Sequence, residues 1–215
     1  MSMPGDETTV AVVDDEPAVR RGIARLLAAS GYRTECFASA LAFLDRAQDL
    51  EPGCVIADVA MPDMTGLELQ RALIARKAAY PLIFVTGHGD LRAGVRAMRD
   101  GAVDFLAKPF EPGELLAAVQ RAVDRDRSRR AVVQSLEQIE RLVDSLTRRE
   151  REVFERVVVG MLNKQIAGEL RITEKTVKAH RARVMRKMRV RSVAELARMA
   201  EKLDIRAPTA RPPAS

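Results

Sequence analysis

The chain has 215 residues, of which 47% are hydrophobic and 31% are charged. This composition supplies enough apolar side chains for a folded core and excludes an intrinsically disordered protein. No apolar run approaches the roughly 20 residues that a membrane helix needs, and the first residues lack the apolar stretch of a signal peptide. Cys36 and Cys54 are expected to be free thiols. We therefore expect a cytoplasmic protein without membrane contact, disulfide bonds or structural zinc.

Charge is divided unevenly along the chain. Residues 1–120 contain 12 basic and 17 acidic residues, a net charge of −5, whereas residues 121–215 contain 24 basic and 13 acidic residues, a net charge of +11. An acidic half followed by a basic half indicates two domains with different partners. Excess positive charge is typical of a domain that binds a polyanion, so the second half is the candidate for nucleic-acid binding.

In the first half, short apolar runs of β-forming residues alternate with segments of helical periodicity. Five strands and five helices in alternation predict an α/β domain, a doubly wound, flavodoxin-like parallel sheet covered by helices on both faces. The strands are expected at 9–13, 32–37, 54–57, 82–85 and 103–107, and the helices are expected to begin near residues 17, 40, 66, 91 and 112. The fifth helix is expected to run from Pro112 toward Arg121.

Chemically distinctive side chains stand where four of these strands end. Ligands of such sheets bind at the carboxyl ends of the strands, so these side chains are expected to meet in one pocket. Three close carboxylates repel one another unless a cation lies among them, and hard oxygen ligands suit Mg²⁺. A carboxylate beside Mg²⁺ can attack a phosphoryl group, whose oxygens an ammonium and a hydroxyl could bind. The residues are Asp14, Asp15, Asp58, Thr86 and Lys108.

Residues 9–121 resemble the receiver domain of bacterial two-component response regulators. The resemblance rests on four motifs in the family's order and spacing: VVDDEP at 12–17, ADVAMPDMTGLEL at 57–69, FVTGHGD at 84–90 and GAVDFLAKPF at 101–110. It implies that Asp58 is the phosphoacceptor. It also implies that Asp15, Asp58 and the backbone carbonyl of Ala60 ligate Mg²⁺, with Asp14 acting mostly through water.

By the same resemblance, Thr86 and Lys108 engage the phosphoryl group, Phe105 is the aromatic switch residue, and the Lys108–Pro109 bond is cis. One alternative is an aspartyl-phosphate hydrolase built on the same sheet. That enzyme would need an acid/base carboxylate two residues after the nucleophile, where this chain has Ala60. Another alternative, a regulator that is never phosphorylated, is opposed by the intact set of Asp15, Asp58 and Lys108.

Residues 125–142 are predicted to form a helical linker, because no Gly or Pro interrupts residues 114–159. Apolar residues recur along it at spacings of four and three, as in the seam of a coiled coil, but over only about two heptads. Two interpretations stay open: a coiled coil, or a helix docked on one of the chain's own domains. The residues are Val132, Leu136, Ile139, Val143 and Leu146.

Residues 143–206 are predicted to form an all-α four-helix domain. Thr147 and Ser192 each begin a capping box, and Asn163 and Thr173 are predicted N-caps. The short connection between the second and third helices is the signature of a helix-turn-helix. The helices are expected near 148–159, 164–170, 174–190 and 193–203, followed by a disordered tail at 207–215.

The third of these helices has an apolar face and a basic face. Residues 174–191 contain eight basic residues and one acidic residue. At 100° per residue, Val177, Val184 and Met188 form the core stripe. Small side chains between cations on the opposite face would let the helix approach the floor of a major groove, and its N-terminal N–H groups could bind a phosphate. That face carries Lys175, Lys178, Ala179, Ala182 and Arg186.

This half resembles the LuxR-type helix-turn-helix. The matching segments are LTRREREVF at 146–154, GMLNKQIAGEL at 160–170 and ITEKTVKAHRARVMRKM at 172–188. The resemblance implies that the helix-turn-helix spans 163–182, that Lys178 and Ala179 face bases, and that cations flanking them suit phosphates. The implied DNA-contacting residues are Asn163, Lys164, Lys175, Thr176, Lys178, Ala179, Ala182 and Arg183.

The combination of both halves is similar to the NarL/FixJ class of response regulators, with TVKAHRARVMRKM and GHGD favouring FixJ-type members. It implies a DNA-binding transcription regulator rather than an enzyme. A sensor histidine kinase would phosphorylate Asp58 in the presence of Mg²⁺, and phosphorylation would promote homodimerisation and binding to promoter DNA. RNA polymerase is a further possible partner.

Overall fold

The structure is a computed structural model, which describes residues 8–87 and 91–205. The predicted tail at 207–215 lies outside the described residues. The chain divides into two compact units, residues 1–130 and 131–215. No helix in the described part of the chain is long and apolar enough to span a membrane.

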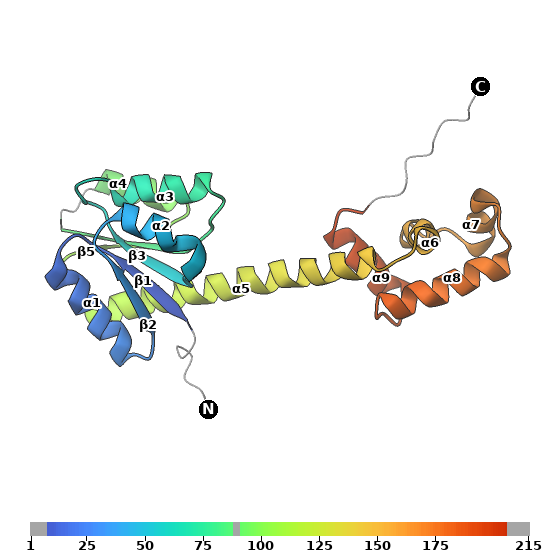
Figure 1. Ribbon diagram of the computed structural model, residues 1–215, viewed down its shortest axis with the longest axis horizontal. Helices are drawn as coiled ribbons and strands as arrows, with labels where there is room; N and C mark the ends of the chain where they lie inside the picture. The colour runs from blue at the N-terminus through green and yellow to red at the C-terminus, as the bar shows by residue number, and fades with distance from the viewer. Residues whose placement is uncertain (1–7, 88–90, 206–215) are drawn as a thin grey trace, which may run out of the picture. The chain divides into compact units, whose positions relative to one another are not determined.

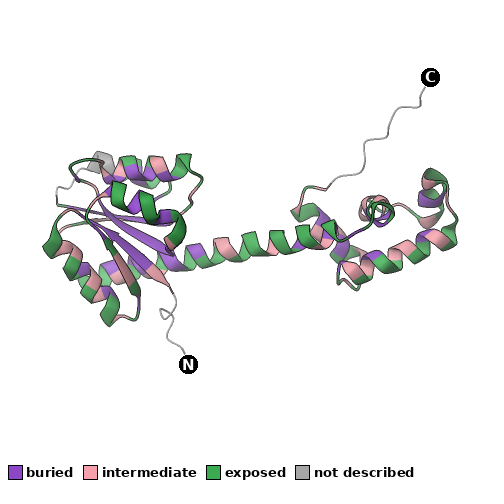
Figure 2. Cartoon of the chain, in the orientation of Figure 1, coloured by how far each residue is buried: buried purple, intermediate pink, exposed green. Residues whose placement is uncertain are grey.

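The first unit contains the predicted five-stranded sheet. All neighbouring strands are parallel and their order is β2-β1-β3-β4-β5. Its central strands are almost wholly buried, because helices cover both faces (Figures 1 and 2). The α/β fold class is therefore confirmed. The strands are β1 (Thr9–Val13), β2 (Arg33–Phe37), β3 (Cys54–Asp58), β4 (Leu82–Thr86) and β5 (Asp104–Ala107).

Alternate residues of the strands face two separate cores. Ala11 and Val13 pack against α2 (Ala40–Leu50), α3 (Gly66–Ala75) and α4 (Leu91–Arg99) on one face of the sheet. Val10 and Val12 pack against α1 (Pro17–Ala29) and the first part of α5 (Pro112–Asp144) on the other. Period-two alternation thus buries both faces of a central strand, as a doubly wound sheet requires.

Helix α5 joins the predicted fifth helix to the predicted helical linker. It has 33 residues and runs past Arg121 through residues 125–142 without a break, so the predicted linker is helical. The boundary between the two units falls within this helix, after Arg130. With no Gly or Pro after the first turn, nothing in the sequence interrupts the helical hydrogen bonds.

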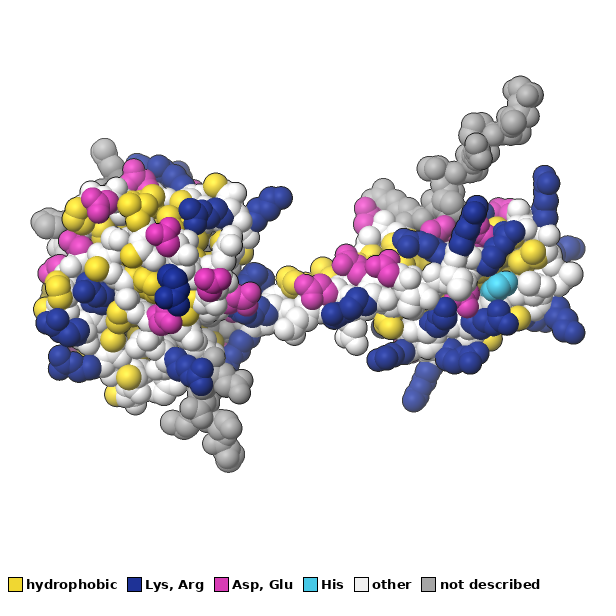
Figure 3. Space-filling model, viewed as in Figure 1, with side chains coloured by type: hydrophobic (Ala, Val, Ile, Leu, Met, Phe, Trp, Pro, Cys, Tyr) yellow, Lys and Arg dark blue, Asp and Glu magenta, His cyan; other side chains and the backbone are white. Residues whose placement is uncertain are grey.

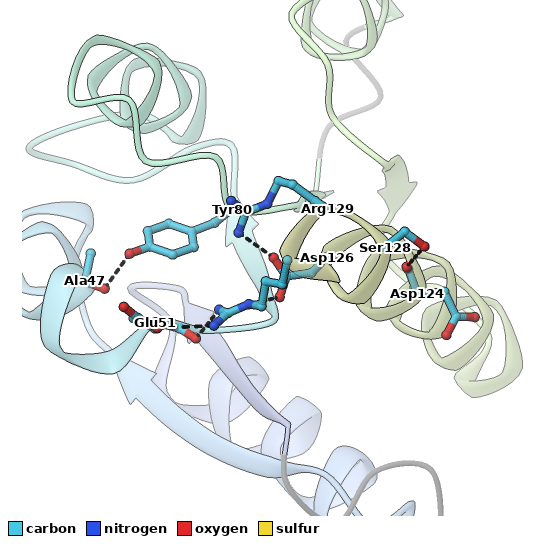
Figure 4. Close-up of polar contacts among 8 residues, drawn as sticks. Ala47, Glu51, Tyr80, Asp124, Asp126, Ser128 and Arg129 are labelled. Carbon is cyan, nitrogen blue, oxygen red and sulfur yellow. Dashed lines mark hydrogen bonds and ion pairs between the residues drawn. The ribbon is translucent and has the colours of Figure 1, made fainter. Parts of the chain in front are cut away.

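Polar contacts fasten the middle of α5 to the first unit (Figure 4). The Asp126 side chain is only 4% exposed, and it accepts hydrogen bonds from Arg129 at 2.7 Å and from Arg130 at 2.5 Å. Arg130 also donates to the carboxylate of Glu51 at 3.1 Å and to its backbone carbonyl at 2.8 Å. These contacts explain why the first unit extends to Arg130, past residue 125, where the predicted linker begins.

The apolar residues of the linker divide between solvent and the second unit. Ile139, Val143 and Leu146 are buried in the core of the second unit, whereas Val132 is 60% exposed and Leu136 is half-buried. Three of the five apolar residues of the predicted coiled-coil seam are therefore buried against the chain's own second unit. This packing favours the docked helix over the coiled coil.

The second unit is a bundle of short helices around one core, joined by the end of α5. Thr147 and Ser192 cap α6 and α9 as predicted, and Thr173 caps α8 by accepting a hydrogen bond from the N–H of Thr176 at 3.2 Å. The helices are α6 (Arg148–Val158), α7 (Asn163–Leu170), α8 (Glu174–Lys187) and α9 (Val193–Lys202).

Two details of this unit differ from the prediction. Asn163 is not the N-cap of α7 but its first residue, and Leu162 stands at the cap position. The Asn163 side chain is instead engaged by Arg181 of α8 at 2.6 Å, a contact between helices that local sequence does not reveal. Helix α8 ends at Lys187 rather than near Val190, and Arg189 beyond it adopts a left-handed φ of 56°.

Candidate functional site: an acidic pocket and a basic helix

The predicted pocket residues stand at the carboxyl edge of the sheet. Asp58 is the last residue of β3 and Thr86 is the last residue of β4. Asp14 follows β1 directly, and Lys108 follows β5. Because all five strands are parallel, these ends lie along the same edge.

Lys108 joins two of the acids. Its Nζ lies 2.9 Å from Oδ2 of Asp14 and 2.8 Å from Oδ2 of Asp58, and Oε1 of Glu16 lies 3.6 Å from the same nitrogen. The side chains of Asp14 and Asp58 are only 1% and 5% exposed, whereas that of Glu16 is 61% exposed. One cation thus compensates two carboxylates that are almost wholly removed from water.

Backbone amides hold the other carboxylate oxygens. The N–H of Glu16 donates to Oδ1 of Asp14 at 2.8 Å, and the N–H of Ala60 donates to Oδ1 of Asp58 at 3.2 Å. The Arg20 guanidinium donates to the backbone carbonyl of Asp14 and so steadies the turn after β1. Each buried acid is therefore held at both oxygens.

Burial and hydrogen-bonded ion pairing have opposite effects on the pKa values of Asp14 and Lys108. Burial raises the pKa of Asp14, although Lys108 and the N–H of Glu16 favour its ionised form. Burial alone would lower the pKa of Lys108, but hydrogen bonds to Asp58 and Asp14 outweigh it and raise that pKa. Lys108 therefore stays protonated at neutral pH.

The pocket suits a hard divalent cation. Carboxylate oxygens of Asp14, Glu16 and Asp58 all lie within 4.8 Å of one another. Such oxygens are the ligands that Mg²⁺ prefers. Asp15, the predicted direct ligand, does not belong to this group, whereas Glu16, to which the sequence analysis gave no role, does. The run of three acidic residues after β1 was the signal that could have pointed to Glu16.

Thr86 ends β4, and Phe105 lies in the neighbouring strand β5. Thr86 is buried, and its backbone carbonyl accepts a hydrogen bond from the N–H of Lys108 at 2.7 Å. Phe105 is half-buried, with its ring centroid 6.4 Å from that of Phe84. A Cβ at Gly94 of α4 would lie 3.2 Å from the Phe105 ring, so the ring rests against α4 where a side chain would crowd it. The Lys108–Pro109 bond is cis, as predicted.

Helix α8 presents the predicted basic face to solvent. Its buried residues include Val177 and Val184, with Met188 buried just beyond its end. In Figure 3, Lys and Arg side chains crowd the visible face of the second unit. Among the predicted DNA-contacting residues, Asn163 and Thr176 are half-buried, and the exposed ones are Lys164, Lys175, Lys178, Ala179, Ala182 and Arg183.

An ion pair between the half-buried Lys187 of α8 and the buried Glu150 of α6 joins the two helices, and the sequence did not predict it. Lys187 donates to the Glu150 carboxylate at 2.6 Å and to the backbone carbonyl of Ser145 at 2.9 Å. The hydrogen bond from Lys187, with further ones from Thr147, lowers the pKa of Glu150 to about 2. Together with the Arg181–Asn163 contact, this pair fixes α8 between α6 and α7.

Comparison with known protein families identifies both units. Residues 10–120 match the response regulator receiver domain, and residues 144–200 match the LuxR family of bacterial regulatory proteins. The chain belongs to the two-component response regulators of the NarL/FixJ class. It is a DNA-binding transcription regulator rather than an enzyme, and its two domains imply a kinase and DNA as partners.

Individual relatives are similar in sequence to this chain along nearly its whole length. It is 41% identical over 201 residues to the response regulator protein TmoT of Ectopseudomonas mendocina, covering 94% of this chain and 91% of that protein. It is 43% identical over 192 residues to the transcriptional regulatory protein FixJ of Rhizobium meliloti, covering 89% and 94%. Among solved structures, the response regulator StyR is 44% identical with a TM-score of 0.83, covering 91% of this chain and 98% of that one.

Proposed function

We propose that a sensor histidine kinase phosphorylates Asp58 and that this event promotes dimerisation and promoter binding. The observation that carries the proposal is the Lys108 bridge between Asp14 and Asp58, in a chain that also carries the exposed basic face of α8. The first feature supplies a phosphoacceptor with its counter-charge, and the second supplies a surface for DNA.

The transfer begins with attack of an Asp58 carboxylate oxygen on the phosphorus of the kinase phosphohistidine. An O–P bond forms, the N–P bond breaks, and the imidazole leaves as the neutral base after taking up a proton. The N–H of Ala60 keeps the other Asp58 oxygen in place. Mg²⁺ bound by Asp58, Asp14 and one adjacent carboxylate would supply positive charge against the phosphoryl oxygens.

Lys108 and Thr86 would then bind the phosphoryl group on Asp58. Lys108 already contacts Oδ2 of Asp58 at 2.8 Å, so it is placed to bind a phosphoryl oxygen by charge, and Thr86 would bind another through its hydroxyl. Phe105 is the proposed switch, because its ring rests against Gly94 of α4. A shift of this ring would alter the surface of α4, where Val95 and Met98 are each 46% exposed. We assign the dimer contact to this face.

Dimerisation links the two halves of the mechanism. Two copies of α8 on a two-fold DNA site multiply the affinity of two weak half-site contacts, because the second copy binds at a high effective concentration. Lys178, Ala179 and Ala182 are assigned to bases and Lys164, Lys175 and Arg183 to phosphates. RNA polymerase would be recruited by the DNA-bound dimer.

Intact mass measurement tests the acceptor. With Mg²⁺ and acetyl phosphate, the wild-type chain is expected to gain about 80 Da, the mass of one phosphoryl group. The Asp58→Asn variant keeps the shape of the side chain and is expected to gain nothing. Asp63→Asn is the matched control, because Asp63 is exposed outside the pocket, and it should be labelled like the wild type. Labelling of the Asp58→Asn variant would place the acceptor elsewhere.

A further inference from the structure

The receiver unit contains a second cavity, remote from the phosphorylation pocket. It has a volume of about 410 Å³ and is bounded by the end of α3, the loop that leads into β4, the α4–β5 turn and two arginines of α5. It adjoins Leu82, the first residue of β4, whereas Thr86 of the phosphorylation pocket is the last. The two sites therefore lie at opposite ends of the same strand. Small-molecule sites typically have volumes of roughly 300–1,000 Å³.

A buried amide on the wall of this cavity lacks a partner. Gln70 is only 2% exposed, and its Nε2 donates to the backbone carbonyl of Ala97 at 3.2 Å. Its Oε1 is buried and has no hydrogen-bond partner among the described residues. A buried acceptor without a hydrogen bond lowers the stability of the fold. We therefore expect a molecule that fills the cavity to donate a hydrogen bond to this oxygen.

Cationic groups stand on the α5 side of the cavity. Arg129 extends from α5 toward Tyr80 and donates through Nη2 to Asp126, while its buried Nε lacks a partner among the described residues (Figure 4). Arg125 is exposed and makes a 3.3 Å contact with the carbonyl of Gly101. Arg129 is already paired with Asp126, so the donors that remain for an anion at this end are the Nε–H of Arg129 and the exposed guanidinium of Arg125.

The remaining wall is mostly apolar. Leu73 and Leu82 are buried, and Ile74 is 56% exposed at the rim. Pro81 completes this surface at the start of β4. Such a wall favours an apolar body over a filling of water alone, because water would leave these side chains without dispersion contacts.

We propose that this cavity binds a small hydroxylated carboxylic acid with an apolar body, such as a hydroxyaryl acid. The carboxylate would accept hydrogen bonds from Arg129 Nε and from Arg125. The hydroxyl would donate to Oε1 of Gln70, and the apolar body would lie against Leu73, Pro81 and Leu82. The site is separate from the proposed phosphorylation of Asp58 and does not depend on it.

Isothermal titration calorimetry of the full chain tests this site. The probes are 4-hydroxybenzoate, 4-hydroxyphenylacetate and 3-(4-hydroxyphenyl)propanoate, in which the distance between hydroxyl and carboxylate increases, each compared with its analogue lacking the hydroxyl. At least one hydroxylated acid is expected to bind, and its analogue is expected to bind about tenfold more weakly, because one hydrogen bond to a buried acceptor is lost.

Variants locate the binding. Arg125→Gln is expected to weaken binding of that acid about tenfold, whereas the same change at Arg25, exposed on α1, should leave it unchanged. Ala79→Trp places a bulky ring at the exposed rim and should abolish binding. Phosphorylation of each variant by acetyl phosphate verifies its fold. Absence of binding by all three acids, or equal binding by the wild type, Arg125→Gln and Ala79→Trp, would overturn the proposal.

Discussion

Lys108 determines the state of the acidic pocket at the scale of single residues. It neutralises Asp14 and Asp58 together, and both are nearly inaccessible to water. In the proposed mechanism, a bound metal ion would take over part of this neutralisation and leave Lys108 available for phosphoryl oxygens. The same residue would then stabilise the unmodified pocket and bind the phosphoryl group of the modified one.

The sequence predicted most of this pocket because the residues occupy strand ends, which a parallel sheet necessarily brings together. Asp14, Asp58, Thr86 and Lys108 were found in this way. The run of acidic residues after β1 indicated Glu16 as a candidate, but its distance from Asp14 and Asp58 depends on the turn between β1 and α1. There Glu16 adopts extended angles, φ −79° and ψ 110°, just before Pro17 begins the helix.

The third carboxylate ligand of Mg²⁺ is open to a direct test. We expect Asp15→Asn to lower Mg²⁺ affinity at least tenfold and Glu16→Gln to lower it less. Glu16 is longer and largely exposed, so it loses more side-chain entropy on ligation than the half-buried Asp15. Calorimetric titration with Mg²⁺ compares the two variants with the wild type. A larger loss in Glu16→Gln would assign the third ligand to Glu16.

At the scale of elements, α8 carries the proposed DNA-binding surface and contacts α6 through the Glu150–Lys187 pair. The capping residues Thr147, Thr173 and Ser192 were predicted correctly, because each cap is encoded within four residues. The Glu150–Lys187 pair was missed because it joins residues 37 positions apart. The end of the first unit at Arg130 was missed for a related reason, since the contact between Glu51 and Arg130 spans 79 positions.

Glu150 should make the stability of the second unit depend on pH. Its pKa is lowered from 4.5 to about 2 by Lys187, so its contribution is present above pH 4.5 and is lost as the pH falls toward 2. We expect Glu150→Gln to lower the free energy of unfolding by about 2 kcal/mol at pH 7, after allowance for the partial exposure of Lys187. The difference from the wild type should shrink between pH 4.5 and 2.

Thermal denaturation followed by circular dichroism at pH 7 and at pH 3 measures this effect. Glu155→Gln is the control, because Glu155 pairs with the half-exposed Arg151 at 3.5 Å and should contribute little. An equal destabilisation by Glu150→Gln at both pH values would show that the loss is one of packing rather than of charge.

Two lysines on α8 should affect DNA binding in different ways. Lys178→Ala should reduce the preference for a cognate over a scrambled site by roughly 1–3 kcal/mol, because Lys178 is assigned to a base. Lys175→Ala should weaken binding to both sites alike and reduce the log–log salt slope by about 0.9, because a phosphate contact is lost. Fluorescence anisotropy on both duplexes at several salt concentrations separates these effects. If neither variant changes the affinity for DNA or the salt slope, α8 is not the helix that contacts DNA.

The whole molecule joins an acidic receiver unit, which contains the proposed phosphoacceptor, to a basic LuxR-type unit, which contains the proposed DNA-contacting helix α8. The helix α5 belongs to both, because its first part packs on the receiver sheet and its end is buried in the core of the second unit. Between them, Val132 and Val133 are exposed. The sequence predicted both units and a helical connection, but the assignment of α5 residues to one unit or the other required their long-range contacts.

The central claim is that phosphorylation of Asp58 increases DNA binding through dimerisation. The most direct measurement is fluorescence anisotropy of the full chain on a two-fold duplex selected from random DNA with the phosphorylated protein. We expect acetyl phosphate and Mg²⁺ to raise the affinity of the wild type at least tenfold, with a steeper dependence on protein concentration, and to leave Asp58→Asn unchanged. Equal affinity of the wild type with and without acetyl phosphate, at full phosphorylation by mass, would contradict the account.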